Sequence, residues 1–265
     1  MFMNNDPLHQ SLFVGADWLL YAGHDGYQHS EMLAPAVLIA QPGHTIMCHI
    51  DGQVEITSAG LLHQAGKWSY ANAVGFAILY FDPVSDVGRQ IQCIQNGGCP
   101  FDISLNGVGW EEVYFQRLLE GQISVAEAAQ LVDLIRRAIV STHQIAELDR
   151  RLMSASQQLT ANPAGRLDLK SLASANQLSP ERLRHLFKQQ IGMTLSKYKS
   201  WRQLHDMCLH LAESYGRSFQ WNTSDAIKHV GFYDDAHGLR TLSHYFGPRS
   251  SMTETPIHLI NCLEQ

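Results

Sequence analysis

The sequence has no long apolar run, no closely paired cysteines and no excess of positive charge over the whole chain. Because no stretch of about eighteen apolar residues occurs, a membrane span is not expected. The opening MFMNNDPLHQ has no basic segment, so a secretion signal is not expected either. The five cysteines are odd in number and include no C-x2-C pair, which indicates reduced thiols in a cytoplasmic protein.

Signatures of an enzyme are also missing. The N-terminal half contains no H-x-H pair, and its two histidine pairs, His24/His29 and His44/His49, are each five residues apart. On a regular strand an odd separation sends side chains to opposite faces, so neither pair is expected to chelate a metal. Neither a nucleophile–base pair nor a glycine-rich phosphate loop is present. We therefore expect no cofactor and no catalytic metal; a metal assembled from distant histidines such as His24, His49 and His63 is the open alternative.

Charge is distributed unevenly along the chain. The net charge of the 265 residues is −6, but residues 163–252 hold 12 Lys and Arg against 7 Asp and Glu, whereas residues 1–162 hold 7 against 16. Such asymmetry indicates a basic nucleic-acid-binding part joined to an acidic partner domain. Since charges are screened beyond about 10 Å at 0.1 M salt, the distant acidic part does not forbid DNA binding.

A repeat occupies the basic part. SPERLRHLFKQQIG (179–192) and DDAHGLRTLSHYFG (234–247) each run from an N-capping residue to a glycine stop, with an apolar and a polar stripe at helical spacing. Each follows a short helix and a tight turn, in 168–178 and 222–232. Two helices joined by a tight turn form a helix-turn-helix unit, and two copies are stronger evidence than one.

One long amphipathic helix is predicted between the two copies, over residues 194–214. Twenty-one residues at about 1.5 Å each span about 30 Å. Successive major-groove faces of B-DNA lie about 34 Å apart. A rod of this length could hold two recognition helices near consecutive grooves, although an ordinary core helix is the alternative.

The segment from about 166 to 249 resembles the paired helix-turn-helix domain of AraC/XylS-type transcription regulators, over about a third of the chain. The residues that carry the resemblance are Leu169, Leu172, Ala173, Ser179, Pro180, Leu183, Phe187, Gly192, Tyr198, Arg202, Ala226, Gly231, Phe232, Asp234, His237, Arg240, Phe246 and Gly247. FAILYFDPVSDVGRQ (76–90) resembles the sensory half of some members. The resemblance implies sequence-specific binding of double-stranded DNA and a small-molecule effector. It is also compatible with contacts to RNA polymerase and with a homodimer.

DNA-contacting residues follow from the polar faces of these helices. For the first unit we expect base and backbone contacts from Arg182, Arg184, His185 and Lys188; for the second from His237, Arg240 and Thr241; and for the intervening helix phosphate contacts from Lys197, Lys199 and Arg202. The second unit is expected to be the weaker reader. Alternatively, the second unit is a protein-binding module.

Three departures from the family pattern weaken the second unit. Gly238 stands where the repeat places Leu183. A glycine within a helix costs about 1 kcal/mol against alanine, and we also expect it to leave a hole in the packing, so that Gly238→Leu would stabilise the domain. The connection YGRSFQW (215–221) is longer than usual. PRSSM follows Gly247 in place of the family's Ser-Pro ending.

Residues 12–105 contain short apolar runs that end at Gly, Pro or Asp, which is typical of a sandwich or a barrel. In the family this position is a cupin-like barrel that senses a small molecule. We expect a ligand pocket in it, lined by Trp18, Tyr27, His49, Trp68 and Tyr70, with plain core packing of the aromatic rings as the alternative.

Residues 111–160 are predicted to be helical, and Ser124 with Glu127 forms a capping box. The apolar stripe of that capped helix either covers the barrel or pairs two subunits. The predicted fold is therefore α+β. It comprises a cupin-like sensory domain (1–108), a helical linker (109–162), a double helix-turn-helix domain (163–252) and a tail (253–265). The expected function is transcription regulation, and a cupin-type enzyme with an accessory helical domain is the alternative.

Overall fold

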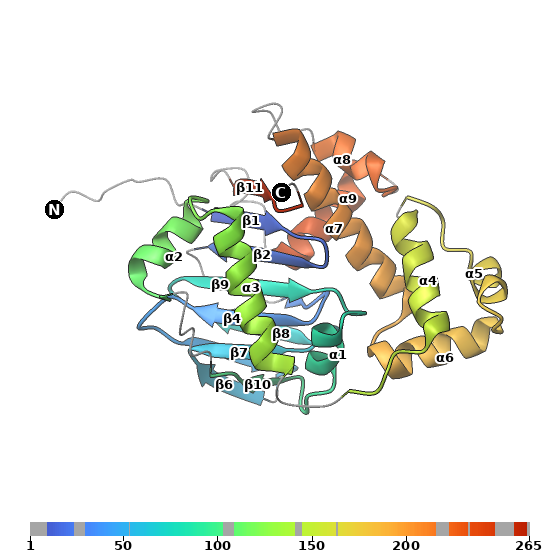
Figure 1. Cartoon of the computed structure of the whole chain (residues 1–265), viewed down its shortest axis with the longest axis horizontal. Helices are drawn as coiled ribbons and strands as arrows, with labels where there is room; N and C mark the ends of the chain where they lie inside the picture. Colours follow the sequence, from blue (N-terminus) through green and yellow to red (C-terminus); the bar gives the residue numbers. More distant parts are fainter. Residues whose placement is uncertain are drawn as a thin grey trace.

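The computed structural model combines two β-sheets with a set of surrounding helices (Figure 1). It describes residues 10–23, 30–52, 54–102, 109–140, 145–162, 164–215, 223–232, 234–246 and 257–263. The sheets come mainly from the first hundred residues, and the helices follow, so the expected α+β class is confirmed. Among the described residues, none of the helices is both long enough and apolar enough to cross a membrane.

The strands form two separate hydrogen-bonded sheets. The larger has the order β10 (Gly98–Pro100), β7 (Gly60–His63), β4 (Ala36–Ala40), β9 (Phe76–Phe81), β2 (Trp18–Gly23), β1 (Gln10–Val14) and β11 (Ile257–Asn261). The smaller has the order β3 (Ser30–Glu31), β8 (Trp68–Asn72), β5 (Ile46–Ile50) and β6 (Val54–Ser58). The expected closed cupin barrel is therefore corrected to two sheets that do not close into one ladder.

Residue patterns explain which strand lies where. The central strands β4 (AVLIA) and β9 (FAILYF) are buried at every position because both faces of the larger sheet are covered. In β8 (WSYAN) buried and exposed residues alternate, as expected for a sheet with one face in solvent. The interior of the sensory part therefore lies between the two sheets, and the outer face of the smaller sheet is open.

Helices form most of the described chain that follows β9. Their bounds are α1 (Asp86–Gln92), α2 (Glu112–Leu119), α3 (Val125–Val140), α4 (Arg150–Ala161), α5 (Leu169–Ala175), α6 (Pro180–Ile191), α7 (Leu195–Tyr215), α8 (Thr223–His229) and α9 (Asp235–Phe246). Within the region predicted to be helical, α4 begins at Arg150, because Asp149 caps it by accepting the N–H of Arg151 at 2.9 Å.

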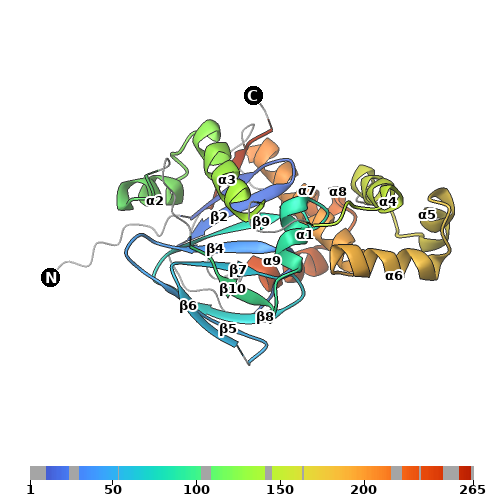
Figure 2. The same ribbon diagram turned by 60° about the horizontal axis from the view of Figure 1, so that its bottom comes forward.

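Helices α2 and α3 cover the outer face of the larger sheet (Figure 2). The predicted capping box is confirmed: Ser124 N donates to Glu127 Oε2 at 2.7 Å, and Glu127 N donates to Ser124 Oγ at 3.1 Å. Leu131, Ile135 and Ile139 are buried in the same core cluster as the sheet. The apolar stripe of α3 therefore covers the sheet, one of the two roles that the sequence left open.

Helix α7 joins the two halves of the molecule. Its predicted extent is confirmed, and it lies against the sensory sheets through Trp201, whose ring centroid is 6.3 Å from that of Tyr80. A single apolar cluster runs from the interior of the sheets through α7 into α5, α6 and α8. The helical half is therefore packed against the sensory half through a shared apolar core.

Candidate nucleic-acid interface

Helix α6 has the local features that the sequence predicted. Ser179 Oγ accepts the N–H of Arg182 at 3.2 Å, Pro180 occupies the first turn, and Gly192 ends the helix in the left-handed conformation with φ of 82°. These caps satisfy backbone groups that the ends of a helix leave unpaired. The predicted helix over 179–192 is thereby confirmed.

The two faces of α6 differ sharply in exposure. Its buried face consists of Leu183, Leu186, Phe187 and Ile191. All four predicted contacts on the opposite face, Arg182, Arg184, His185 and Lys188, are exposed. Glu181 is the one acid in the first turn of α6 and lies 4.0 Å from Arg184, at the limit of an ion pair. Figures 1 and 2 both show α5 and α6 at the edge of the molecule, away from the sheets.

A rigid turn positions α6 against α5. Asp168 caps α5 by accepting the N–H groups of Lys170 and Ser171, and Leu178 N donates to Ala173 O at 2.9 Å beyond the end of that helix. Gln177 in the turn has φ of 55°, the left-handed region. Helices α5 and α6 are therefore held together by a short hydrogen-bonded turn, and the polar face of α6 is presented to solvent.

The second unit copies the first in its helix lengths. Helices α5 and α8 each have seven residues, and α6 and α9 each have twelve. The turn also repeats, since Gly231 has φ of 71° and Phe232 N donates to Ile227 O at 3.2 Å. The chain between α8 and α9 is one residue longer than that between α5 and α6. The internal repeat predicted from the sequence is thus confirmed as two structural copies.

The packing hole expected at Gly238 does not exist. Gly238 is buried, and a Cβ placed on it would lie 2.6 Å from Ile227 Cγ1. The side chain of Ile227 fills the space that Leu183 fills in the first unit, where the residue matching Ile227 is Ala173. In the first unit the small residue, Ala173, is on the first helix and the large one, Leu183, is on the second. In the second unit the order is reversed, with Ile227 on the first helix and Gly238 on the second. The expectation that Gly238→Leu stabilises the domain is therefore wrong.

Helix α9 has less open surroundings than α6. It packs on α8 and also lies beside β3 of the smaller sheet. Arg240 is exposed, Thr241 is half-buried, and Leu239 is partly buried against the core, so the helix is rotated to cover Leu239. His237 belongs to α9, but its side chain lies outside the described residues.

Two cations of α7, Lys197 and Arg202, pair with carboxylates of the sensory half, and Arg202 also pairs with Asp206 of α7 itself. Arg202 is buried, and its guanidinium is 3.0 Å from Asp82 Oδ2 and 3.0 Å from Asp206 Oδ1. The phosphate contact of Arg202 stays a prediction, and in this conformation its guanidinium is buried between two carboxylates. Lys197 pairs with Glu31 of β3 but is itself exposed, and Lys199 is half-buried.

The expected aromatic pocket is not assembled. Trp18 is buried in the core between the larger sheet and α2–α3. Trp68 and Tyr70 are each 43% exposed on the outer face of the smaller sheet, where His49 lies beside Tyr70 with ring centroids 6.3 Å apart. Tyr27 lies outside the described residues. Trp18 thus lies in the core, whereas Trp68 and Tyr70 lie on the outer surface because the alternation of β8 directs their rings outward.

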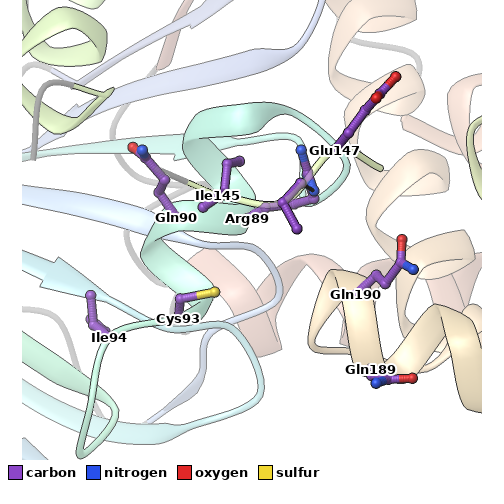
Figure 3. Close-up of a pocket in the computed structure, with 9 residues that line it drawn as sticks. Arg89, Gln90, Cys93, Ile94, Ile145, Glu147, Gln189 and Gln190 are labelled. Carbon is purple, nitrogen blue, oxygen red and sulfur yellow. Dashed lines mark hydrogen bonds between the residues drawn. The ribbon is translucent and has the colours of Figure 1, made fainter. Parts of the chain in front are cut away.

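A different cavity lies between α1 and the end of α6 (Figure 3). Its volume is about 480 Å³, and its lining consists of Arg89, Gln90, Cys93, Ile94, Ile145, Ala146, Glu147, Gln189 and Gln190. Arg89 is buried and donates to Ala146 O and to Asp86 Oδ1, both at 2.8 Å, and its Nε has no partner among the described residues. Gln190 Oε1 accepts the N–H of Asp149 at 3.0 Å. The cavity therefore joins the sensory half, the linker and the recognition helix.

Of the histidines considered as distant metal ligands, His49 and His63 lie in the described part of the chain. His63 is fully buried, its Nδ1 lies 2.7 Å from Gln64 O, and burial lowers the pKa of its imidazole to about 4. His49 is half-exposed on the smaller sheet, and His24 lies outside the described residues. Within the parts of the chain that the structure describes, no group of three His, Cys, Asp or Glu side chains is arranged to hold a metal ion.

Comparison with known proteins identifies the fold. Neither a protein-family model nor a curated protein sequence matches the chain. Among solved structures, an apo variant of ToxT from Vibrio cholerae strain SCE256 is similar at 9% identity, with 92% of this chain and 96% of that chain covered and a TM-score of 0.54. ToxT from Vibrio cholerae O395 is similar at 7% identity over 90% and 92% of the chains, with a TM-score of 0.50. ToxT is a regulator of the AraC family, so the family resemblance noted from the sequence extends to the fold of over 90% of the chain.

Proposed function

We propose that the protein is a sequence-specific DNA-binding transcription regulator whose first helix-turn-helix unit is the principal reader. The observation that carries this proposal is the exposed basic face of α6, set on a buried apolar face and held by a rigid turn. The fold shared with a transcription regulator supports it.

The chemistry of α6 suits the major groove. An arginine such as Arg184 can donate two hydrogen bonds to the O6 and N7 of guanine, which discriminates against other bases by about 1–3 kcal/mol. Lys188, one turn later on the same helix, suits a phosphate contact. Such contacts position the protein without reading sequence, and each one makes the logarithm of the affinity fall by about 0.9 per logarithm of salt.

We infer that an effector binds in the cavity between α1 and α6 rather than at the predicted aromatic residues. The volume is in the range of small-molecule sites, which is about 300–1,000 Å³. The buried Nε of Arg89 offers a donor that lacks an acceptor, and Ile94 and Ile145 provide an apolar wall. A molecule bound there touches the recognition helix directly, which would couple occupancy to DNA binding.

The DNA-binding proposal is tested by selecting bound duplexes from a random-sequence library with the full chain. The wild type should enrich one sequence motif. Arg184→Ala combined with Lys188→Ala should lose about a hundredfold in affinity for it, or about 3 kcal/mol. The matched control combines Arg117→Ala with Arg137→Ala, which removes the same charge from α2 and α3 and should change little. Failure to enrich any motif, or equal losses in both variants, contradicts the proposal.

The effector proposal needs its own test. Cys93→Trp fills the cavity from the exposed end of α1. Small molecules that raise the melting temperature of the wild type should lose that effect in Cys93→Trp, whereas Tyr70→Ala should leave it intact. If Tyr70→Ala abolishes the rise in melting temperature and Cys93→Trp does not, the effector site is on the outer face of the smaller sheet instead.

A further inference from the structure

The chain returns to the sensory half after the second helix-turn-helix unit. Residues 257–261 form β11, which adds itself in parallel to β1, with a register that runs from Gln10 opposite Ile257 to Val14 opposite Asn261. Cys262 N extends the pairing by donating to Val14 O at 2.9 Å. In the larger sheet, β11 is one of the two edge strands, and β1 lies between β11 and β2 (Figure 1). The sequence assigned these residues to a tail.

Both faces of β11 are covered. Ile257 and Leu259 are buried in the cluster that contains the apolar face of α7, and α7 packs along the strand. On the other face, Ile260 packs into the cluster beneath α2 and α3. Gly121, between those helices, has φ of 66°, and a Cβ there would lie only 2.7 Å from His258 Cβ. The strand is therefore held between α7 and the α2–α3 connection.

The position of β11 determines how α7 sits on the sensory half. Helix α7 connects the two helix-turn-helix units, and part of the surface on which it rests is a strand from the end of the same chain. Where α7 contacts the sensory half, Arg202 pairs with Asp82, Lys197 pairs with Glu31, and His205 Nε2 lies 2.8 Å from Gly15 O. Loss of β11 would remove two buried apolar side chains from beneath α7.

We propose that β11 is a C-terminal strap that fixes the helical half to the sensory half and thereby lowers its affinity for DNA; the regulatory part of this proposal rests on the proposed function. In the strapped state, carboxylates of the sensory half neutralise Lys197 and Arg202. Helix α9 is also kept beside β3. Release of the strap frees these cations for phosphate and α9 for a second groove.

The test compares two substitutions of the same chemistry. Leu259→Asp places a charge at a side chain that is 7% exposed and should detach β11, whereas Leu263→Asp changes a side chain that is 44% exposed beyond the strand. Leu259→Asp should raise amide exchange by about tenfold in both β1 and α7, since strand release is a local opening. It should also strengthen binding to the selected duplex by roughly tenfold, because two cations regain phosphate. Leu263→Asp should do neither.

A second arm covers the case in which Leu259→Asp does not fold. A chain that ends at residue 256 lacks β11 and should show raised exchange in β1 and α7, and a synthetic peptide of residues 257–263 should restore protection in both. Unchanged exchange in α7 after strand release overturns the strap. Increased exchange with unchanged affinity for a duplex that the wild type binds overturns its regulatory role. If neither protein binds any duplex, the proposed function fails, and exchange alone decides whether β11 holds α7.

Discussion

The two helix-turn-helix units have helices of equal length but very different surroundings. Helix α6 lies at the edge of the molecule with four exposed basic or imidazole side chains, whereas α9 lies beside β3 and has Leu239 turned into the core. The repeat therefore specifies the same local fold twice. The surroundings of each copy determine how much of the polar face of its second helix is open to solvent.

The interiors of the two units differ in a compensating way. The first places small Ala173 on its first helix and large Leu183 on its second, and the second unit places Ile227 and Gly238 at the matching positions. Close packing explains why these changes occur together, since either one alone would leave a cavity or a clash. Gly238 departs from the family pattern, but the larger Ile227 beside it compensates for the missing side chain.

The largest effect is expected from Leu183→Ala in the first unit. Leu183 is fully buried, so the substitution should lower the free energy of unfolding by about 3 kcal/mol. Adding Ala173→Ile should restore at least about 1 kcal/mol, because it recreates the packing of the second unit. Urea unfolding of the two single variants and the double variant measures both terms. A double variant no more stable than Leu183→Ala would show that the units are not packed as exchanged copies.

Gly238→Leu should destabilise the second unit by about 2 kcal/mol, because the added side chain overlaps Ile227. The measurement is the melting temperature, and Ile227→Ala in the same chain should recover part of the loss. A higher melting temperature for Gly238→Leu alone would reinstate the packing hole that the sequence suggested.

Arg184→Ala should weaken binding to the selected duplex by about 1–2 kcal/mol and relax the preference at one base position. Arg137→Ala on α3 removes the same charge at an exposed site outside both helix-turn-helix units and should leave affinity unchanged. Fluorescence anisotropy with matched and mismatched duplexes gives both quantities. Equal losses of affinity in Arg184→Ala and Arg137→Ala would show that Arg184 contributes only nonspecific electrostatic attraction.

The smallest effect is expected from Arg240→Ala, below about 0.5 kcal/mol, because α9 is held beside β3 while the strap is in place. The same duplexes and method apply. In the Leu259→Asp background, the cost of Arg240→Ala should increase, because α9 is then free to enter a groove. A large loss in the wild-type background would mean that the two units are ranked in the wrong order.

Local signals in the sequence predicted the helices well. Ser179 before Pro180, Gly192 at the end, and the capping box at Ser124 and Glu127 each act within a few residues, and all are present in the structure. The exchange at Gly238 also left a signal, because the larger Ile227 stands where the repeat has Ala173. Reading the two positions together would have predicted it.

Contacts between distant segments could not be predicted in the same way. Arg202 has the exposed-looking spacing of a phosphate contact, but its partner Asp82 is 120 residues away. Strand β11 pairs with β1 from the opposite end of the chain, so no local pattern names its partner. The aromatic pocket failed for a related reason, since only the assembled sheet shows that Trp68 and Tyr70 face outward.

A guanine-methylation interference footprint of the wild-type chain on a selected duplex tests the central claim most directly. We expect interference in one major-groove segment, lost in Arg184→Ala and kept in Arg240→Ala, because the polar face of α6 is open to solvent whereas α9 lies beside β3. Two equally strong segments about one helical turn apart, about 34 Å, would contradict it by showing that both recognition helices read DNA together.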